Sequence, residues 1–322
     1  MNNEVSANSP TAVSPHQSRM RYSAAEHRKM ARRGRFRAEG TAWAFLGPMY
    51  LFFLVFMVIP VLFVIWWSFQ QGGLMDGSHF VGFQNYLTLP NQPDAVAAVE
   101  NTLRFAVMAI PAELVCGLVM AMLLVRVRHG GSVYRFLIYF PSLVPGVVAA
   151  LMWYFLTNVD FGLLNNILGW FGIKPQVWLG SGLALPVLAN TEIWTNAGFW
   201  AIFFLAALIG LPPELYEAGE MDGASAWQRL IWITLPQLRR VATFAIVVGT
   251  IWGLQVFDTP YVLTKGGPGT ETVTVVYKVY SYVFGSPDKV GSAATISVVL
   301  LVVILILTLI QLRALRGREE GV

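Results

Sequence analysis

Three long stretches of this sequence contain no aspartate, glutamate, lysine or arginine, and they restrict the possible fold more than any other feature. They span residues 42–69, 136–159 and 291–312. A helix of about 20 apolar residues crosses the hydrocarbon core of a bilayer, and each stretch is long enough to do so. Only 12% of all residues are charged, against about 25% in a typical soluble domain. The sequence therefore predicts an integral membrane protein.

Three further apolar segments carry one or two charged residues each, and we expect them to cross the membrane as well. They are residues 101–125 with Arg104 and Glu113, residues 185–210 with Glu192, and residues 241–264 with Asp258. An open sheet edge cannot be satisfied in lipid, and the alternation that a membrane barrel needs is absent. The predicted fold class is therefore an all-α membrane protein with six transmembrane helices.

The ends of the chain differ from this membrane part in composition. Residues 1–40 are rich in Ser, Asn, Arg and Glu, so we expect a basic, disordered tail. The first apolar stretch exceeds the roughly 7–15 residues of a cleavable signal peptide, so it is predicted to stay in the chain. Residues 41–313 would form the transmembrane domain, and residues 314–322 would form a second tail.

The distribution of lysine and arginine gives the orientation. Of the 22 such residues, 17 lie in four alternate segments, namely the tail to residue 40, residues 126–135, residues 211–240 and the tail after residue 312. Cytoplasmic segments carry this excess, so both termini are predicted to be cytoplasmic in a multi-pass protein of the cytoplasmic (inner) membrane. The alternation requires an even number of spans. Beside a span, the N-terminal basic run fits contact with anionic membrane lipid better than a nucleic-acid site.

The loop between the fourth and fifth predicted spans carries the most specific pattern. It runs LPPELYEAGEMDGASAWQRLIWITLP from residue 211 to residue 236. Pro212 and Pro213 suit the first turn of a helix, and Glu217 suits its N-terminal half. Pro236 would close a second helix. We therefore expect two short amphipathic helices along the membrane surface, with an exposed turn between them. A solvated connector without a partner is the plain alternative.

This loop resembles the EAA loop of permease subunits in binding-protein-dependent ABC importers. That pattern is Glu-Ala-Ala, three residues, Gly, nine residues and Ile-x-Leu-Pro. It is matched here by Glu217-Ala218-Gly219, Gly223 and Ile233-Thr234-Leu235-Pro236. Gly219 replaces the family's alanine, which predicts a helix looser by up to about 1 kcal/mol. The resemblance implies that the loop, residues 211–239, couples to an ATPase through Glu217, Ala218, Gly219, Asp222, Gly223, Ile233, Leu235 and Pro236.

The resemblance extends over about residues 42–313. Asn101-Thr102-Leu103, the Phe136–Pro145 region and the stretch Tyr261 to Pro268 look like the carbohydrate-uptake branch, which includes maltose- and glycerol-phosphate-type permeases. This implies the ABC type I importer permease fold and the import of a sugar or sugar-like solute. It also implies three kinds of partner, namely a second, non-identical permease subunit, two ATPase subunits and an extracytoplasmic solute-binding protein.

The chain is not expected to be an enzyme or to bind a cofactor itself. It has no G-x-x-x-x-G-K-[ST] phosphate loop, so ATP and Mg would bind to the partner ATPase subunits. The glycine-rich run Lys265-Gly266-Gly267-Pro268 lacks the Lys-Ser/Thr ending and is predicted to be a turn. No His or Cys cluster has the spacing of metal ligands, so no metal site is predicted.

Polar residues within the fourth and fifth predicted spans mark a candidate solute site, because such residues usually face a bundle interior or a water-filled path. Asn196 and Phe199 are three residues apart, as are Trp252 and Gln255, so each pair shares a helix face. Resemblance to the maltose-type permease adds Gly253 and Val256. The candidate substrate-binding set is Asn196, Phe199, Trp252, Gly253, Gln255 and Val256.

Other roles for these residues stay open at this point. Asn and Gln often bond one helix to another, and Trp or Phe often faces lipid. Glu192 could either pack or line the path, and Glu113 would pair with another helix or face the pore. Two other function classes also compete. An ion- or proton-coupled secondary carrier would have no use for the EAA-type loop. A membrane-embedded sugar transferase would need charged clusters at the membrane borders, where this sequence has only isolated charges.

Overall fold

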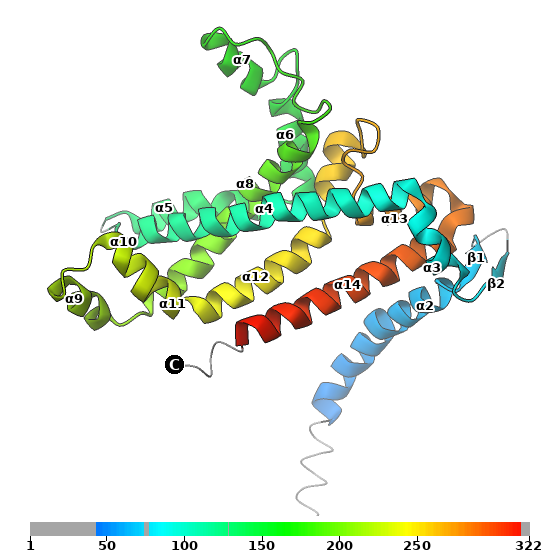
Figure 1. The fold of residues 1–322 in the computed structure, drawn as a ribbon, viewed down its shortest axis with the longest axis horizontal. Helices are drawn as coiled ribbons and strands as arrows, with labels where there is room; N and C mark the ends of the chain where they lie inside the picture. Colours follow the sequence, from blue (N-terminus) through cyan, green and yellow to red (C-terminus); the bar gives the residue numbers. More distant parts are fainter. Residues whose placement is uncertain (1–42, 74–76, 128, 317–322) are drawn as a thin grey trace, which may run out of the picture. The chain divides into compact units, whose positions relative to one another are not determined.

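The computed structural model describes residues 43–73, 77–127 and 129–316, and it is predominantly helical (Figure 1). The predicted N-terminal tail lies outside the described residues, as does most of the C-terminal tail. The chain divides into two compact units, residues 1–62 and residues 63–322. The predicted fold class, a helical membrane protein, is confirmed.

The first unit holds most of one long apolar helix, which runs from Trp43 to Trp67 and is long enough to cross a bilayer. It contains η1 (Leu54–Val58) and α2 (Ile59–Trp67). The π-helical turn η1 ends two residues before Pro60, which has no N–H to donate. None of the residues of the most apolar window is buried. A helix that is apolar on every side suits lipid rather than water.

Three single helices in the second unit are also long and apolar enough to cross a membrane. They are α4 (Pro93–Val125), α8 (Ala184–Ile209) and α14 (Val290–Arg316). They coincide with the predicted spans 101–125, 185–210 and 291–312. Helix α4 begins eight residues earlier than predicted because Pro93 takes its first turn, where a missing N–H costs nothing. Helix α8 packs along α4 (Figure 1).

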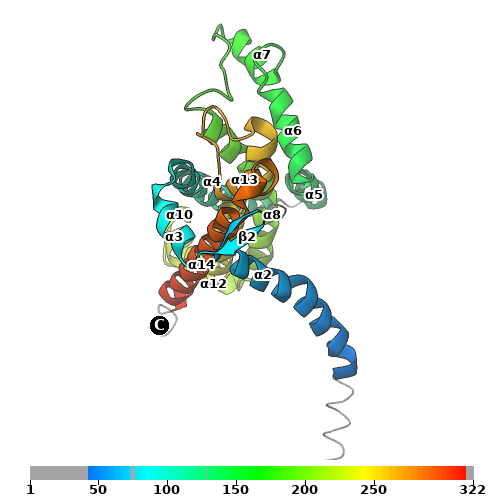
Figure 2. The ribbon, with the colours of Figure 1, turned by 90° about the vertical axis from the view of Figure 1, so that its right-hand side faces the viewer.

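The predicted span 136–159 is not one straight helix. It consists of α5 (Gly131–Tyr139), η3 (Phe140–Leu143) and α6 (Gly146–Leu156), and its two parts are bent by 93°. Pro145 cannot donate to the helix ladder, and it forces Val144 before it into an extended conformation with ψ of 127°. Helix α6 therefore turns away from α5 and leads toward α7 (Leu163–Trp170; Figures 1 and 2).

The predicted span 241–264 is not continuous either. Helix α12 (Arg239–Leu254) ends at Leu254, ten residues earlier than predicted, and η5 (Pro260–Thr264) follows after a break. The Thr274 hydroxyl donates to the carbonyl of Val256 at 3.1 Å and so holds the non-helical backbone. On the other side, residues Ala226–Gln237 meet α12 at 71°. If each bent pair is one span, the described residues contain up to six spans, in agreement with the predicted number.

Short elements pack around the first turns of α4 and α14. They are β1 (Gln70–Gly72), β2 (Ser78–Phe80), α3 (Gln84–Thr88), η2 (Leu89–Asn91), α13 (Val275–Gly285) and η6 (Pro287–Lys289). The two strands form an antiparallel hairpin. Asn85 donates to the carbonyls of Ser68 and Gln70 at 3.0 and 2.8 Å and thereby joins α3 to the hairpin.

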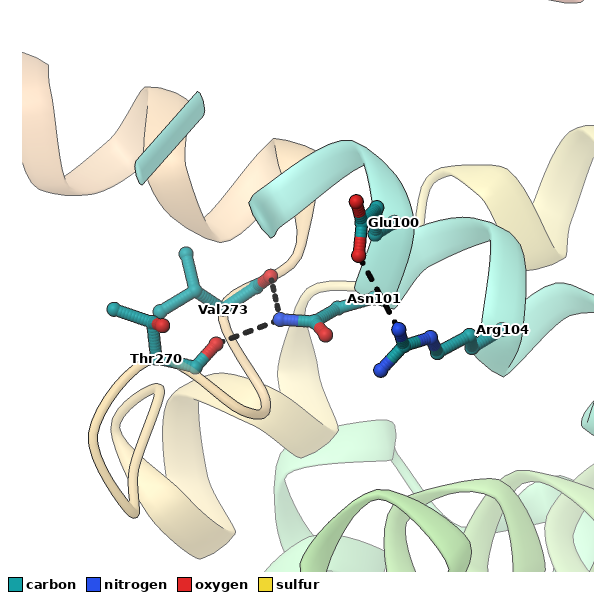
Figure 3. Close-up of polar contacts among 5 residues, drawn as sticks. All are labelled: Glu100, Asn101, Arg104, Thr270 and Val273. Carbon is teal, nitrogen blue, oxygen red and sulfur yellow. Dashed lines mark hydrogen bonds and ion pairs between the residues drawn. The ribbon is translucent and has the colours of Figure 1, made fainter. Parts of the chain in front are cut away.

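The Asn-Thr pair of α4 holds the loop that follows η5. Figure 3 shows Asn101, which donates to the carbonyls of Thr270 and Val273 at 2.6 and 3.2 Å. Its neighbour Thr102 accepts the N–H of Val275 at 2.9 Å. The predicted turn is observed here, with Lys265 in the left-handed region at φ of 49°. Two distant segments are thus joined by side-chain bonds to backbone groups.

A second contact fixes this loop to the segment before α8. Ser181 and the N–H of Gly182 both donate to the Glu271 carboxylate. These two hydrogen bonds, the Ser181 hydroxyl first, hold the pKa of the Glu271 carboxyl below its usual range. The loops that border the end of α12 are therefore tied to both α4 and α8.

Candidate functional site

The loop from residue 211 to residue 239 folds as two short helices joined by a tight turn. Helix α9 spans Pro213–Met221 and α10 spans Ala226–Arg229. Gly223 lies between them with φ of 72°, a conformation that suits glycine. Its N–H bonds to the carbonyl of Glu220, and the N–H of Ala224 bonds to that of Gly219. This is a Schellman motif, so the predicted turn is a defined helix end.

The second helix has its own start and its own links to the first. Ser225 and Gln228 form a reciprocal capping box, with hydrogen bonds of 3.3 and 2.7 Å. Glu220 forms an ion pair with Arg229 across the turn. The hydroxyls of Tyr216 and Thr234 lie 3.1 Å apart and connect α9 to η4 (Leu230–Thr234). These contacts make one compact hairpin of helices.

Gly219 lies at the contact between the two arms of this hairpin. A Cβ added at this position would lie 2.9 Å from Cδ1 of Ile233 and 3.5 Å from Cγ of Arg229. The absence of a side chain therefore allows Ile233 to pack against α9. The replacement of the family's alanine by glycine has a structural reason that the sequence did not reveal.

The turn presents several predicted coupling residues to the outside. Glu217, Ala218, Asp222 and Gly223 are all exposed, and so is Met221, which is 88% exposed. Met221 was not among the predicted coupling residues, although an apolar residue in a polar turn was a usable signal. Behind the turn, a cavity of about 460 Å³ separates the hairpin from the ends of α4 and α8.

Leu235 and Pro236 lie in α11 (Leu235–Gln237), on the arm that leads into α12. The helical run Ala226–Gln237 ends one residue after Pro236, so this arm closes where the sequence predicts it to close. The loop is therefore continuous with α12 except for the 71° bend.

A second candidate site is a cavity of about 240 Å³ between α4, α8 and the end of α12. Five of the six residues predicted to bind solute line it, namely Asn196, Trp252, Gly253, Gln255 and Val256. Trp252 is 47% exposed, so part of its ring is free to meet a ligand. The early end of α12 has a direct effect here, because residues 255–258 leave the helix and fold around the cavity.

The sixth predicted residue, Phe199, supports the cavity without lining it. Its ring centroid lies 5.5 Å from that of Trp252 and 5.0 Å from that of Trp200. The Ser142 hydroxyl donates to the carbonyl of Thr195 and accepts the N–H of Phe199, at 2.6 and 3.0 Å. The hydroxyl thus bridges the two backbone groups that would otherwise bond to each other within α8. It joins the bend after α5 to α8 at Phe199. Phe199 therefore lies behind the wall of the cavity, against Trp252.

Three acidic residues also line the cavity. The Glu192 carboxylate accepts from Asn196 and from Thr259, both at 3.1 Å. Glu113 is only 4% exposed, and Asp258 lies against Gly146 at the start of α6. Glu192 therefore both packs and lines the cavity, and Glu113 faces the interior of the bundle.

Helix α4 supplies a wall of which only Glu113 was predicted to face the pore. Phe105, Ala109 and Glu113 follow one another at intervals of four residues, and Ile110 lies beside them. This spacing places them on one helix face, which was a usable signal. Among the described residues, no group of three or more His, Cys, Asp or Glu side chains is arranged to hold a metal ion. The cavity thus offers amides, carboxyls and an aromatic face for non-covalent binding.

Residues 113–318 match the family described as the binding-protein-dependent transport system inner membrane component. The chain belongs to this family. The predicted resemblance is confirmed, and with it the assignment as an ABC importer permease. The matched residues include both the helical hairpin at 211–239 and the segments of α8 and α12 that line the cavity. As an inner membrane transport component, the chain is a multi-pass membrane protein.

Relatives of this inner membrane component cover nearly its full length. A trehalose/maltose transport system permease protein from Thermococcus litoralis is 32% identical over 288 residues, which are 89% of this chain and 97% of that protein. An sn-glycerol-3-phosphate transport system permease protein from Escherichia coli is 31% identical over 287 residues, with 88% and 96% covered.

The fold of this inner membrane component also occurs in a solved bacterial ABC transporter that imports the acidic polysaccharide alginate. The TM-score is 0.78 at 23% identity, with 88% of this chain and 98% of that chain covered. A second structure, with an alginate pentasaccharide-bound periplasmic protein, gives a TM-score of 0.76 at 23% identity and covers 86% of this chain and 94% of that chain. These likenesses show the ABC importer permease fold.

Proposed function

We propose that this chain carries a sugar or sugar-like solute across the cytoplasmic membrane as the permease subunit of an ATP-driven importer. The observation that carries this proposal is the cavity at the end of α12, which combines Asn196 and Gln255 with the exposed ring of Trp252. Amides pair with hydroxyl groups, and an aromatic face packs against the C–H groups of a sugar ring. The names of two relatives, which specify trehalose/maltose and sn-glycerol 3-phosphate, support a polyhydroxyl cargo.

The second part of the proposal is that the hairpin at 211–239 docks to an ATPase subunit. Its exposed tip offers Glu217, Met221 and Asp222 to a partner, and its two arms are held rigid by the Schellman turn and the capping box. A rigid element can transmit a displacement, whereas a flexible connector would absorb it. The ATPase subunits would bind ATP and Mg, and this chain would remain non-catalytic.

Helix α12 connects the two sites mechanically. Its 16 residues span about 24 Å. The hairpin adjoins its first residue, and Trp252 lies in its last turn. A movement of the hairpin, driven by ATP binding to the partner, would therefore change the wall of the cavity. This is a two-state element that a remote ligand biases.

The proposed assembly contains this chain, a second and non-identical permease subunit, two ATPase subunits and an extracytoplasmic solute-binding protein. The periplasmic protein present in the second alginate transporter structure supports the last of these. Both termini of this chain and the hairpin would lie in the cytoplasm, where an ATPase can reach them.

The test is to disrupt the tip of the hairpin without unfolding the chain. Glu217→Lys reverses an exposed charge, and Gly223→Asp adds a charge where the backbone tolerates Asp better than a β-branched residue. Both variants should insert into the membrane normally but lose co-purification with the ATPase subunits and lose solute uptake. Gly172→Asp is the matched control, since Gly172 has φ of 70° and, like Gly223, would have no atom within 4 Å of an added Cβ.

The control should retain both uptake and ATPase association. Normal uptake by Glu217→Lys and Gly223→Asp would count against the coupling role. Uptake that persists without any ATPase subunit would instead favour an ion- or proton-coupled carrier.

A further inference from the structure

We propose that the cavity between α4, α8 and the end of α12 excludes anionic solutes, so that the cargo is a neutral or cationic polyhydroxyl compound. This inference rests on the proposed function, because it concerns the solute site of the importer. It separates sugars, polyols and amino sugars from sugar phosphates and uronic acids.

The charges that line the cavity disfavour an anion. Glu113, Glu192 and Asp258 line it, and they come from α4, from α8 and from the segment after α12. Among the described residues, the lining contains no lysine, arginine or histidine. An anion that enters would lose its water without meeting a positive charge, which is costly. It would also be repelled by each ionised carboxyl across a few ångströms of low-dielectric space.

Glu113 adds a buried carboxyl to the wall of this cavity. This residue is only 4% exposed although it borders the cavity. The side chains of Trp200 and Asn196 both interact with its carboxyl. The Asn196 amide has two N–H groups and also donates to Glu192 at 3.1 Å. A Cβ added at Gly249 would lie 3.6 Å from Glu113 Oε1 and 3.7 Å from Trp200 Cζ2, so carboxyl and indole border the same space.

A carboxyl beside this cavity is complemented by a group that can donate a hydrogen bond. A hydroxyl donates and accepts, and an ammonium group donates. A phosphate or carboxylate in its ionised form only accepts. If a carboxyl of the cavity is protonated, it offers one hydrogen and no positive charge, so an anion still gains little. The preference against anions therefore holds in either protonation state.

The experiment measures the charge of the cavity with thiol reagents, so that it does not require the identity of the cargo. Cys116 is the chain's one cysteine, and Cys116→Ala provides the background. Gln255→Cys then places an exposed thiol on the cavity wall, and Trp170→Cys on α7 gives an exposed reference thiol. Both are treated, in the assembled importer in lipid, with methyl methanethiosulfonate and with its anionic sulfonatoethyl analogue.

At each position we compare the reaction rate of the anionic reagent with that of the neutral reagent. This rate ratio should be at least about tenfold lower for Gln255→Cys than for Trp170→Cys. In alkaline buffer, which favours the ionised carboxyls, adding Glu113→Gln or Glu192→Gln, each close to isosteric, should recover several-fold of that difference. Asp160→Asn, which alters an exposed carboxyl elsewhere, should recover none of it. Gly253→Cys is a second lining position and should behave like position 255.

An equal ratio of anionic to neutral rates at positions 255 and 170 would overturn the inference. So would a neutral reagent that reacts at neither 253 nor 255. Neither outcome concerns the hairpin, so the proposed coupling would stand if Glu217→Lys still abolished uptake. Conversely, the cavity could prove charge-selective while the Glu217→Lys variant transports normally. The inference about the cavity would then stand, and the coupling role of the hairpin would be lost.

Discussion

The two candidate sites are built in opposite ways. The hairpin at 211–239 is held by contacts between residues close in sequence, such as Ala224 with Gly219 and Ser225 with Gln228. The cavity draws its walls from residues as far apart as Phe105 and Asp258. Residue spacing and turn residues along the chain determine the hairpin, whereas the shape of the cavity depends on how separate helices pack.

This difference predicts that the cavity is the more sensitive of the two to packing defects at a distance. Helix α8 carries Asn196 and packs closely against α4 at Gly117. At that crossing, a Cβ added to Gly117 would lie 2.6 Å from Cβ of Trp200 and 3.1 Å from the carbonyl of Ala197.

The largest effect is therefore expected from Gly117→Ala. The added methyl group would meet backbone as well as side chain, and overpacking of this kind costs about 1–3 kcal/mol. We expect the unfolding temperature of the purified chain in detergent to fall by several degrees and solute binding to weaken, because α8 moves away from α4. Thermal unfolding followed by size-exclusion chromatography would measure the first effect.

Gly169→Ala is the matched control for this change. Gly169 lies in helix α7, and no atom lies within 4 Å of an added Cβ. Alanine is the better helix former by up to about 1 kcal/mol, so this variant should be as stable as the wild type or slightly more stable. Equal stability of Gly117→Ala and Gly169→Ala would show that the crossing of α4 and α8 does not limit the fold.

The same difference explains which features the sequence could predict. The number of spans followed from apolar length, and the hairpin followed from the positions of Pro212, Pro213 and Pro236. The polar residues of the cavity followed from their presence inside spans. The 93° bend at Pro145 and the end of α12 at Leu254 did not follow, because apolar composition is the same in a straight helix and in a broken one.

Apart from Glu113, the α4 wall was missed for a related reason. Ala109 and Ile110 are apolar and do not differ in sequence from other span residues. They line the cavity because α12 ends early and residues 255–258 lie opposite them. Phe199 was predicted to bind the solute, but it lies behind Trp252 and does not line the cavity. Its ring packs on Trp252, and the Ser142 hydroxyl holds the backbone beside it. Contacts of this kind join residues far apart in the sequence, so residue spacing does not predict them.

A smaller effect should follow from Ser225→Ala in the hairpin. It removes the capping box of α10, which costs about 1 kcal/mol of local stability. Because the hairpin is an independent local structure, the cost should appear there alone, as faster amide hydrogen exchange over residues 223–229. Solute binding at the cavity should be unchanged. Ser225→Thr, which keeps the hydroxyl, should restore slow exchange. Altered solute binding in Ser225→Ala would mean that the two sites are not separable.

The smallest effect is expected from Gly219→Ala, which restores the residue that the family favours. Alanine should stabilise α9 by up to about 1 kcal/mol. Its methyl group would lie 2.9 Å from Cδ1 of Ile233, the flexible end of a side chain that can move by a few tenths of an ångström. The two effects nearly cancel, so hydrogen exchange in α9 and ATPase association should change little. In an Ile233→Val background the contact is relieved, and Gly219→Ala should then slow exchange measurably. If Gly219→Ala slowed exchange equally with Ile233 and with Val at that position, the glycine would owe nothing to this contact.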